Sequence, residues 1–298
     1  MSVLKLQLAW FAWLACGCLL CLDSIAPAAE PPAAPAVAPR APEAKPPEAK
    51  PPEAKPAGAA KEHPLQAVLD WSQRTTARIE SQVQDYTAAF LKREFEDGEL
   101  GDRQRMLLKV RHKPLSIYVY FFAPADRRGE EAIYVEGRNG GNLLGHTTGI
   151  TGALLGTLSL APDGVIAMDG QHRPLTEIGI LNLCRRLTQV AQKGVKNPQC
   201  RVEISRDKKV DDRACRCIQI TNPDDREQFR FSRVRWYIDE QLDLPVRFEA
   251  YDWPAEPGAD PPLYEEYTYT KVKLNNAFTD QDFDVKNPRY GYAEGRRQ

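Results

Sequence analysis

The sequence predicts an α+β domain in which a large antiparallel sheet curls into an open half-barrel, with helices covering its concave face. The first observation behind this prediction is the order of patterns: a helix, a run of strands, an apolar segment with a second helix, and more strands. The second observation is the stretch IYVYFFAP, residues 117–124, which is apolar on both faces. A half-buried strand alternates apolar and polar side chains, so this strand must be covered on two sides.

The N-terminal zone, residues 1–29, has the layout of a secretory signal peptide. Lys5 supplies a positive start, residues 6–22 form an apolar run, and the small residues SIAPAAE follow it. An uncleaved membrane anchor is one alternative, since the run is close to the minimum length that spans a bilayer. A lipoprotein signal is another, although the run stays apolar after the cysteines that would carry the lipid: Cys16, Cys18 and Cys21.

Residues 30–61 read as a disordered linker rich in proline, alanine, glutamate and lysine. The repeat PEAKPPEAKPPEAKP cannot pack a core, because proline fixes φ and removes backbone donors. At about 3.1 Å per residue, the extended linker would reach on the order of 100 Å. We therefore expect a periplasmic or secreted protein, or an envelope-anchored one, with its folded domain at residues 62–292 and a disordered tail at 293–298.

Two helices are expected in the folded domain. The second lies within residues 173–194, RPLTEIGILNLCRRLTQVAQKG, where Thr176 is expected to cap the start and Gly194 to end the helix. Its apolar stripe consists of Ile180, Leu181, Cys184, Leu187 and Ala191. The first helix follows Pro64, and its stripe consists of Leu65, Val68, Leu69, Ser72 and Ile79.

Strands are expected on both sides of the second helix. Before the helix, they cover residues 85–97, 103–114 and 117–124 and a hairpin within 130–148 that turns at Asn139–Asn142. After the helix, they cover residues 200–207, 213–221, 228–239, 244–253 and 264–275. The apolar segment Ile150–Ile166 is too broken for a spanning helix and unusually apolar for a loop.

Two stretches carry a resemblance to a known family. WYIDEQLDLPVRFEAYD, residues 236–252, and YTYTKVKLNNAFTDQDFD, residues 267–284, resemble the paired strands and the last strand of the LolA/LolB-like superfamily of outer-membrane lipoprotein carriers. The resemblance extends over most of residues 64–284. It looks closest to an uncharacterised bacterial branch whose second helix starts with a P-L/I-T-x-x-G-I pattern like residues 174–180.

The resemblance implies a half-open barrel whose helices close a hydrophobic cavity, which in the carriers holds the acyl chains of lipoproteins. The apolar segment Ile150–Ile166 would be the lid. Aromatic and aliphatic side chains would line such a cavity. The candidate ligand-binding residues are Phe90, Tyr118, Tyr120, Phe122, Tyr134, Leu143, Leu154, Leu155, Phe231, Trp236 and Phe248.

One departure from the family pattern affects the expected function. The soluble carrier has an arginine just before an aromatic residue on the strand that matches KPLSIYVY, where it holds the lid. This chain has Leu115, Ser116 and Ile117 there. The missing arginine and the long linker favour an anchored lipid-binding protein over a shuttle that hands over lipoproteins.

The folded domain contains four cysteines, and an exported protein can form disulfides. Counting back from the turn RDKKVDD places Cys200 roughly opposite Cys217, so a cross-strand bridge between them is one expectation. Cys184 and Cys215 would then be the second pair. The alternative is four buried free thiols, and no cysteine spacing indicates zinc.

Other chemistry finds little support in the sequence. A net charge of −1 gives no reason to expect a nucleic-acid partner. None of the four histidines lies in a metal-ligand or triad pattern, the paired acids fall at turns, and no cofactor motif is present. We expect no metal site, no cofactor and membrane association only through an uncleaved or lipidated N-terminus.

The leading interpretation is a non-enzymatic cell-envelope protein that binds lipid or lipoprotein acyl chains, with a lipoprotein or an envelope protein as a further partner. The alternative is a tethered structural or interaction domain with a filled cavity. An enzyme acting on an envelope substrate ranks third, and a cleft with a buried acid or histidine pair would favour it.

Overall fold

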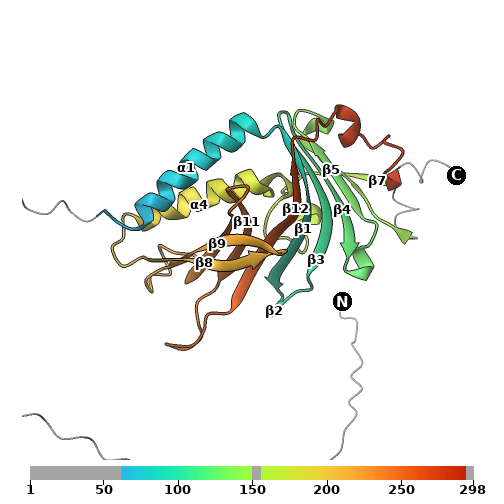
Figure 1. The fold of residues 1–298 in the computed structure, drawn as a ribbon. Coiled ribbons are helices and arrows are strands. Elements are labelled where there is room, and N and C mark those ends of the chain that lie inside the picture. The colour runs from blue at the N-terminus through green and yellow to red at the C-terminus, as the bar shows by residue number, and fades with distance from the viewer. Residues whose placement is uncertain (1–61, 150–155, 293–298) are drawn as a thin grey trace, which may run out of the picture. The chain divides into compact units, whose positions relative to one another are not determined.

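The computed structural model describes residues 62–149 and 156–292, which form one folded unit (Figure 1). The expected signal peptide, linker and tail lie outside these ranges and stay predictions. None of the helices in the described ranges has the length and apolar character needed to span a bilayer.

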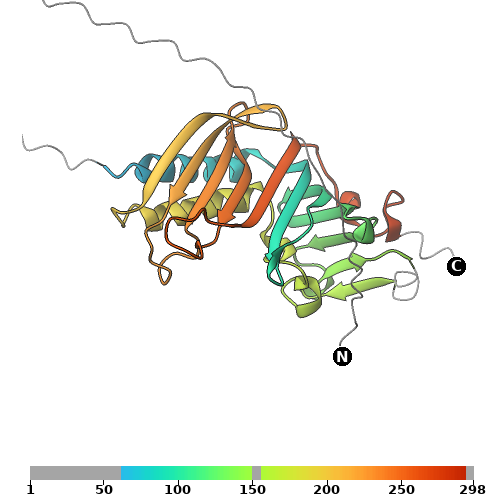
Figure 2. The same cartoon turned by 90° about the horizontal axis from the view of Figure 1, so that it is seen from below.

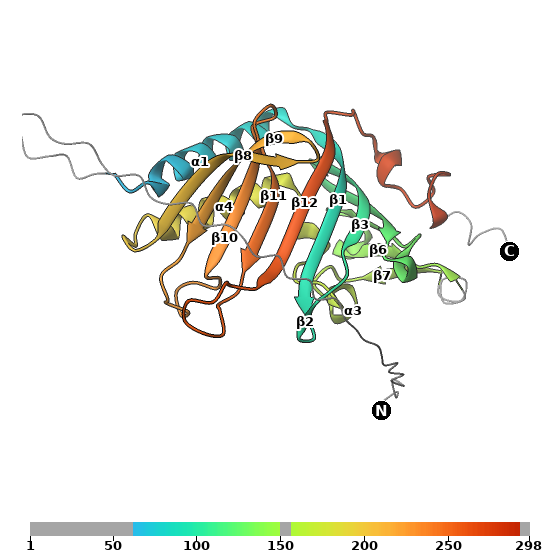
Figure 3. The same ribbon diagram turned by 60° about the horizontal axis from the view of Figure 1, so that its bottom comes forward.

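The main element is a single antiparallel sheet. Its strands lie in the order β7-β6-β5-β4-β3-β1-β12-β11-β10-β9-β8, with β2 paired to β1 (Figure 3). The two edge strands, β7 and β8, do not pair with each other, so the curled sheet stays open and the predicted fold class is confirmed. The strands are β1 Asp85–Glu96, β2 Glu99–Leu100, β3 Gln104–His112, β4 Leu115–Ala123, β5 Glu131–Val135, β6 Leu143–His146, β7 Thr157–Leu160, β8 Arg201–Val210, β9 Arg213–Thr221, β10 Arg233–Asp239, β11 Leu244–Tyr251 and β12 Leu263–Leu274.

The helices lie on the concave side of the sheet, and Figure 2 shows the two long ones beneath the strands from β8 to β12. The predicted stripe of α1 is buried, and so is that of α4 except for Leu181, which is half-buried while Leu183 is buried instead. The two long helices also pack on each other closely, since a Cβ on Gly194 would lie 2.4 Å from Leu65 Cδ1. The helices are α1 Leu65–Gln82, α3 Val165–Met168 and α4 Ile180–Gly194, and the 3₁₀ turns are η1 Ala125–Arg127, η2 Asn139–Gly141, η3 Leu175–Glu177 and η4 Asp280–Phe283.

The start of α4 is held by the sheet rather than by the expected Thr176 cap. The backbone N–H of Gly179 donates to the Tyr269 hydroxyl, and that of Ile180 donates to the Tyr86 hydroxyl, both at 2.9 Å. Gly179 has a φ of 111°, and a Cβ there would lie 2.7 Å from the Tyr86 oxygen, so this position requires glycine. Two tyrosines from β12 and β1 therefore satisfy the free donors of the helix end.

Both faces of β4 are covered, as its sequence requires. The side chains that face the main core are Ile117, Val119 and Phe121. Tyr118 faces the other way, into a second cluster formed with the C-terminal segment, residues 275–292. Its ring stacks on Tyr290 with 4.0 Å between centroids and 12° between planes. The inner face is therefore covered by the core and the outer face by the end of the same domain.

The four cysteines of the described ranges are free thiols, which corrects the expected disulfides. The hairpin between β8 and β9 turns at Asp211 and Asp212, both at positive φ, so β8 runs through most of the stretch expected to be a loop. This longer strand shifts the register, and Ser205 rather than Cys200 pairs with Cys217.

The second expected pair is separated by the two faces of the sheet. Cys184 on α4 belongs to the main core, where the Thr76 hydroxyl donates to its sulfur at 3.4 Å. Cys215 belongs to a small separate cluster with Val210 and Val246. Burial raises the pKa of each of these two thiols to about 11, so both stay protonated and pack as small apolar side chains.

Candidate functional site

A cavity of about 260 Å³, called the first cavity below, opens on the concave face between the strands β1 and β3–β7 and the segment from α3 to α4. On β1, β4 and β7 the wall residues alternate along the strand, so they share one face of the sheet. Ile166 of α3 lines this cavity although the residue is 70% exposed, so α3 lies where the cavity meets solvent. The apolar wall includes Phe90, Met106, Val119, Phe121, Leu143 and Leu160.

The polar end of the first cavity begins on β1. Lys92 and Glu94 follow Phe90 at alternate positions, so all three side chains are on the inner face, and all three are buried. In the sheet register, Glu94 lies directly opposite Glu265 of β12. Two carboxylates in this arrangement repel each other, so the site requires positive charges around them.

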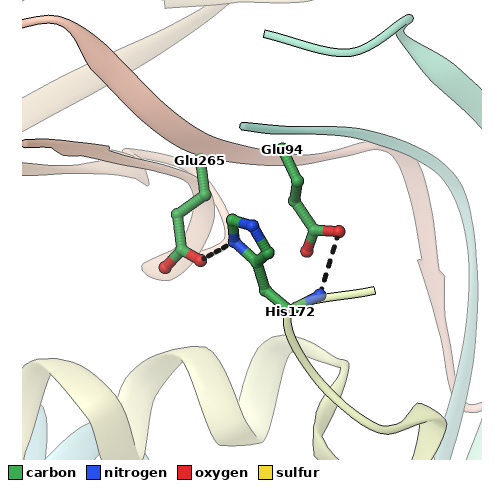
Figure 4. A group of neighbouring side chains, drawn as sticks. All are labelled: Glu94, His172 and Glu265. Atoms are coloured by element: carbon green, nitrogen blue, oxygen red, sulfur yellow. Dashed lines mark hydrogen bonds and ion pairs between the residues drawn. The ribbon is translucent and has the colours of Figure 1, made fainter. Parts of the chain in front are cut away.

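Those positive charges come from Lys92, on β1 itself, and from the loop before α4. Lys92 Nζ lies 2.7 Å from Glu94 Oε2, with the two side chains only 6% and 4% exposed. The Tyr267 hydroxyl is hydrogen-bonded to Glu94 and lies 3.1 Å from Glu265 Oε2. The loop before α4 contributes His172, whose backbone N–H donates to Glu94 Oε2 at 3.2 Å and whose Nδ1 lies 3.1 Å from Glu265 Oε2 (Figure 4). We call these five residues and Arg173 the polar cluster.

The hydrogen bonds of His172 determine its charge. Its Nε2 lies 2.8 Å from the Phe95 carbonyl oxygen, which can only accept, so Nε2 carries a proton. Burial lowers the pKa of His172, but the hydrogen bonds to Glu265 and Phe95 and the charge of Glu94 outweigh it and raise the pKa above its ordinary value. Burial also acts to raise the pKa of Glu265, yet His172 and Arg173 hold that pKa below its usual range. The two groups therefore form an imidazolium–carboxylate pair.

This pairing limits the chemistry of the polar cluster. Glu94, His172 and Glu265 each offer one ligand atom within 4.8 Å of the others, which is close enough for a cation by distance alone. Both ring nitrogens of His172 act as donors, however, and Lys92 and Arg173 already neutralise the two carboxylates. In this protonated state His172 has no free nitrogen lone pair with which to bind a metal ion or to act as a general base.

A second cavity, of about 760 Å³, lies between α4 and the strands β10–β12. Its apolar wall includes Phe231, Trp236 and Phe248, and its rim is polar. The side chains that line both cavities are those of Arg173, Glu177 and Arg186. The two cavities therefore meet at a pair of arginines.

The candidate lining residues have different positions in the structure. Phe90 and Leu143 line the first cavity, and Phe231, Trp236 and Phe248 line the second; their role in binding stays a prediction. Tyr134 packs against the main core but lines neither cavity. Leu154 and Leu155 lie outside the described residues.

Three of the candidates are corrected. Tyr118 and Tyr120 belong to the outer cluster, and Phe122, which is 41% exposed, contacts Tyr120 edge to face at 4.9 Å. They cannot line the first cavity, which takes Val119 and Phe121 from the same strand. Both faces of β4 are apolar, so its alternation does not show which face is the inner one.

The sequence reasoning also missed the polar cluster. The inner-face position of Lys92 and Glu94 was visible, because they continue the alternation that starts at Tyr86 and Phe90. The loop position of His172 follows no periodicity, so nothing in the local sequence indicates that it reaches the two carboxylates.

The expected lid is only partly a lid. Residues 150–155 are outside the described ranges, and residues 157–160 form the edge strand β7 instead of a flap. Leu158 and Leu160 of this strand and Ile166 of α3 line the first cavity. The apolar character of this segment is therefore explained by one sheet edge and one side of the cavity.

Solved structures similar to this chain include a protein of the superfamily that the sequence resembles. A LolA superfamily protein from Nitrosomonas europaea is 13% identical, with 74% of this chain and 97% of that chain covered and a TM-score of 0.30. The lipoprotein LppX from Mycobacterium tuberculosis is 14% identical, with 70% and 98% covered and a TM-score of 0.40. At these values the matches carry no argument about function, and the fold class rests on the strands and helices described above.

A third similar structure is a DUF1329 family protein from Desulfovibrio piger, 11% identical, with 74% of this chain and 97% of that chain covered and a TM-score of 0.33. No curated protein is similar enough to count as a match. The model of the family described as "Protein of unknown function (DUF1571)" matches residues 83–292, which include every strand of the sheet and α4.

Proposed function

The chain belongs to the DUF1571 family, and on that premise we propose that it is a non-enzymatic protein of the cell envelope that binds lipid or lipoprotein acyl chains. The observation that carries the proposal is the first cavity, whose wall combines apolar side chains with charged ones such as Lys92, Glu94 and Arg186. Ligand sites are typically apolar clefts with a few placed polar groups and volumes of roughly 300–1,000 Å³. A cavity of about 260 Å³ is near the lower limit and fits one acyl chain better than several.

The location in the cell envelope is supported by the sequence. The expected signal peptide would export the chain, and the expected proline-rich linker would hold the domain away from its attachment point. The walls of the cavity supply the binding energy, at about 0.8 kcal/mol for each methylene that leaves water. About ten buried methylenes would then contribute roughly 8 kcal/mol, which corresponds to a micromolar dissociation constant before the entropic costs of binding.

The test is a chain-length series. The full chain is purified without detergent, its bound lipid is identified by native mass spectrometry and solvent extraction, and saturated fatty acids of 8 to 18 carbons then compete with a polarity-sensitive dye. Affinity should rise about tenfold for every two methylenes until the chain fills the cavity, and then level off. A clean apo mass and no uptake at any length would support the tethered structural domain instead.

A cavity-filling variant tests whether the lipid binds in the first cavity or on the apolar N-terminal run, residues 6–22. Gly145 of β6 lines the first cavity, and a Cβ there would lie 3.9 Å from the nearest side-chain atoms, those of Leu143 and Leu160. Gly145→Leu should therefore fold and abolish uptake of the longer chains. The matched control is Thr157→Leu, which adds the same side chain at an exposed position that lines neither cavity and should leave uptake unchanged.

A further inference from the structure

Arg186 of α4 is a half-buried arginine on which the charge of Glu265 acts only from beyond ion-pair distance. It makes no hydrogen bond or ion pair with any residue in the described ranges, and it lines both cavities. Its guanidinium lies 5.8 Å from the ring centre of Phe248 and 5.9 Å from that of Tyr267. Arg186 follows Leu183 by three residues, so the two side chains share the side of the helix that faces the cavities. Its five N–H donors therefore lack a protein acceptor.

Arg173 brings a second guanidinium to the same place. It is bound to Glu265 at 3.2 Å and lies 3.8 Å from Glu177, but its Nε is buried and has no acceptor among the described residues. Burial and, next, the charge of Arg173 lower the pKa of Arg186. The two arginines thus repel each other while both retain unused donors, and leaving the buried Nε of Arg173 without an acceptor is costly.

The charges around the junction come close to balance, but no carboxylate of the described residues lies within ion-pair distance of Arg186. Two buried carboxylates, Glu94 and Glu265, face four side chains with positive charge. Glu177, which is 55% exposed, lines the first cavity together with Glu130, Glu131 and Asp169. The positively charged side chains are Lys92, His172, Arg173 and Arg186. An anion between the two arginines would satisfy the unused donors and give Arg186 an ion-pair partner.

We infer that the ligand of this protein carries an anionic head, a carboxylate or a phosphate, which binds between Arg173 and Arg186 while its apolar chain occupies the first cavity. This inference rests on the proposed function and specifies its ligand class. Guanidinium groups match both heads, because their paired N–H donors fit two oxygens at once. The second cavity, whose rim includes Arg185, Lys193 and Arg230, gives a larger head room to extend toward solvent.

The test compares heads on one chain length, using palmitic acid, hexadecyl phosphate and the neutral hexadecanol with the full-length protein. The anionic ligands should bind about ten- to a hundredfold more tightly than the alcohol, which is the range for a hydrogen bond to a charged group. The better of the two anionic ligands identifies the head. Equal binding of acid, phosphate and alcohol would overturn the inference and leave acyl-chain binding intact, whereas no binding of any of the three would refute the proposed function.

Variants of Arg186 test whether this side chain causes the preference for anionic ligands. Arg186→Gln should remove the ten- to hundredfold advantage of the anionic ligands without weakening hexadecanol, and Arg186→Lys should restore part of it. The control Arg206→Gln makes the same charge change on β8, where the side chain is 71% exposed and lines neither cavity, and should keep the advantage. An equal loss for all three ligands in Arg186→Gln would contradict a head-group contact. Saturable binding of inorganic phosphate with the same affinity as hexadecyl phosphate would also overturn the inference, since the chain would then contribute nothing.

Discussion

The two faces of β4 are both apolar, but they are buried in different ways. The inner face contributes Val119 and Phe121 to the wall of a cavity. The outer face contributes Tyr118 and Tyr120 to a cluster that the C-terminal segment, residues 275–292, covers. An apolar strand face is thus no indication of a ligand site by itself, because the same chain can provide the cover.

On the outer face, aromatic rings stack on one another and a lysine lies near three of them. The Tyr118 hydroxyl donates to Glu131 Oε1 at 3.0 Å, while its ring stacks on Tyr290. Lys109 Nζ lies 5.1 to 5.8 Å from the ring centres of Tyr118, Phe278 and Tyr290. These side chains pack on one another, so changes on this face should alter stability, and changes on the inner face should alter binding.

The largest effect is expected on the outer face, from Tyr118→Ala. Truncating a buried aromatic residue removes its contacts and leaves a cavity, which costs about 3–5 kcal/mol of unfolding free energy. Urea unfolding followed by circular dichroism measures this loss. The folded fraction should still take up fatty acid, because Tyr118 lines neither cavity.

Tyr118→Phe is the matched control, since it keeps the ring stack and removes only the hydrogen bond to Glu131. Its cost should be about 1.5–3 kcal/mol, the range for a hydrogen bond to a charged group, since Glu131 keeps the hydrogen bond from the Gly291 N–H. If the alanine variant were no less stable than the phenylalanine variant, the ring stack would not be what holds the C-terminal segment.

The next largest effect is expected at the polar end of the first cavity. Lys92→Met leaves Glu94 as a buried carboxylate without its closest cation, and breaking such a pair costs about 3 kcal/mol. Adding Glu94→Gln should recover most of the lost unfolding free energy, because replacing both partners removes the unpaired charge. A double variant as unstable as Lys92→Met would show that the pair contributes through packing and not through charge.

A matched pair of valines compares the two faces directly. Val119 lines the first cavity and Val135 packs in the outer cluster, and each is 2% exposed. Val135→Ala should cost about 2 kcal/mol, and Val119→Ala about 1 kcal/mol, because the inner change only enlarges an existing cavity. Urea unfolding again measures both variants, and equal costs would mean that the inner face is as tightly packed as the outer one.

The smallest effect expected is a pH dependence that comes from His172. Its pKa is raised in the folded protein, so the stabilisation is complete below the ordinary histidine pKa of about 6.5 and is lost as the pH rises through the folded pKa. Thermal unfolding between pH 6 and 9 should therefore show a loss of stability that the His172→Gln variant lacks. The lowered pKa of Glu265 matters only at acid pH and does not affect this range.

The comparison between wild type and His172→Gln also removes the contribution of His112. Burial lowers the pKa of His112, so its effect has the opposite sign and favours the folded state as the pH rises. Both proteins retain His112, and the difference between their curves reports on His172. Parallel curves over the whole range would contradict the imidazolium–carboxylate pair.

Much of the fold could be predicted from local patterns. The stripes of α1 and α4 and the inner face of β1 all follow from helical or strand periodicity. The register of β8 with β9 could not be predicted in this way, because it depends on where the turn lies, at Asp211 and Asp212. The cap of α4 also escaped prediction, since its partners Tyr86 and Tyr269 come from other elements.

The sequence by itself determined that the domain is an open antiparallel sheet with helices and that β4 is covered on both sides. The reason is that hydrophobic periodicity indicates which face of each strand or helix is buried. Only the tertiary structure decided what provides the cover and where charge gathers. The opposition of Glu94 and Glu265, the loop that brings His172 to them, and the meeting of Arg173 with Arg186 join segments far apart in the chain. Local periodicity contains no information about such partners, since their contacts depend on strand register and helix placement.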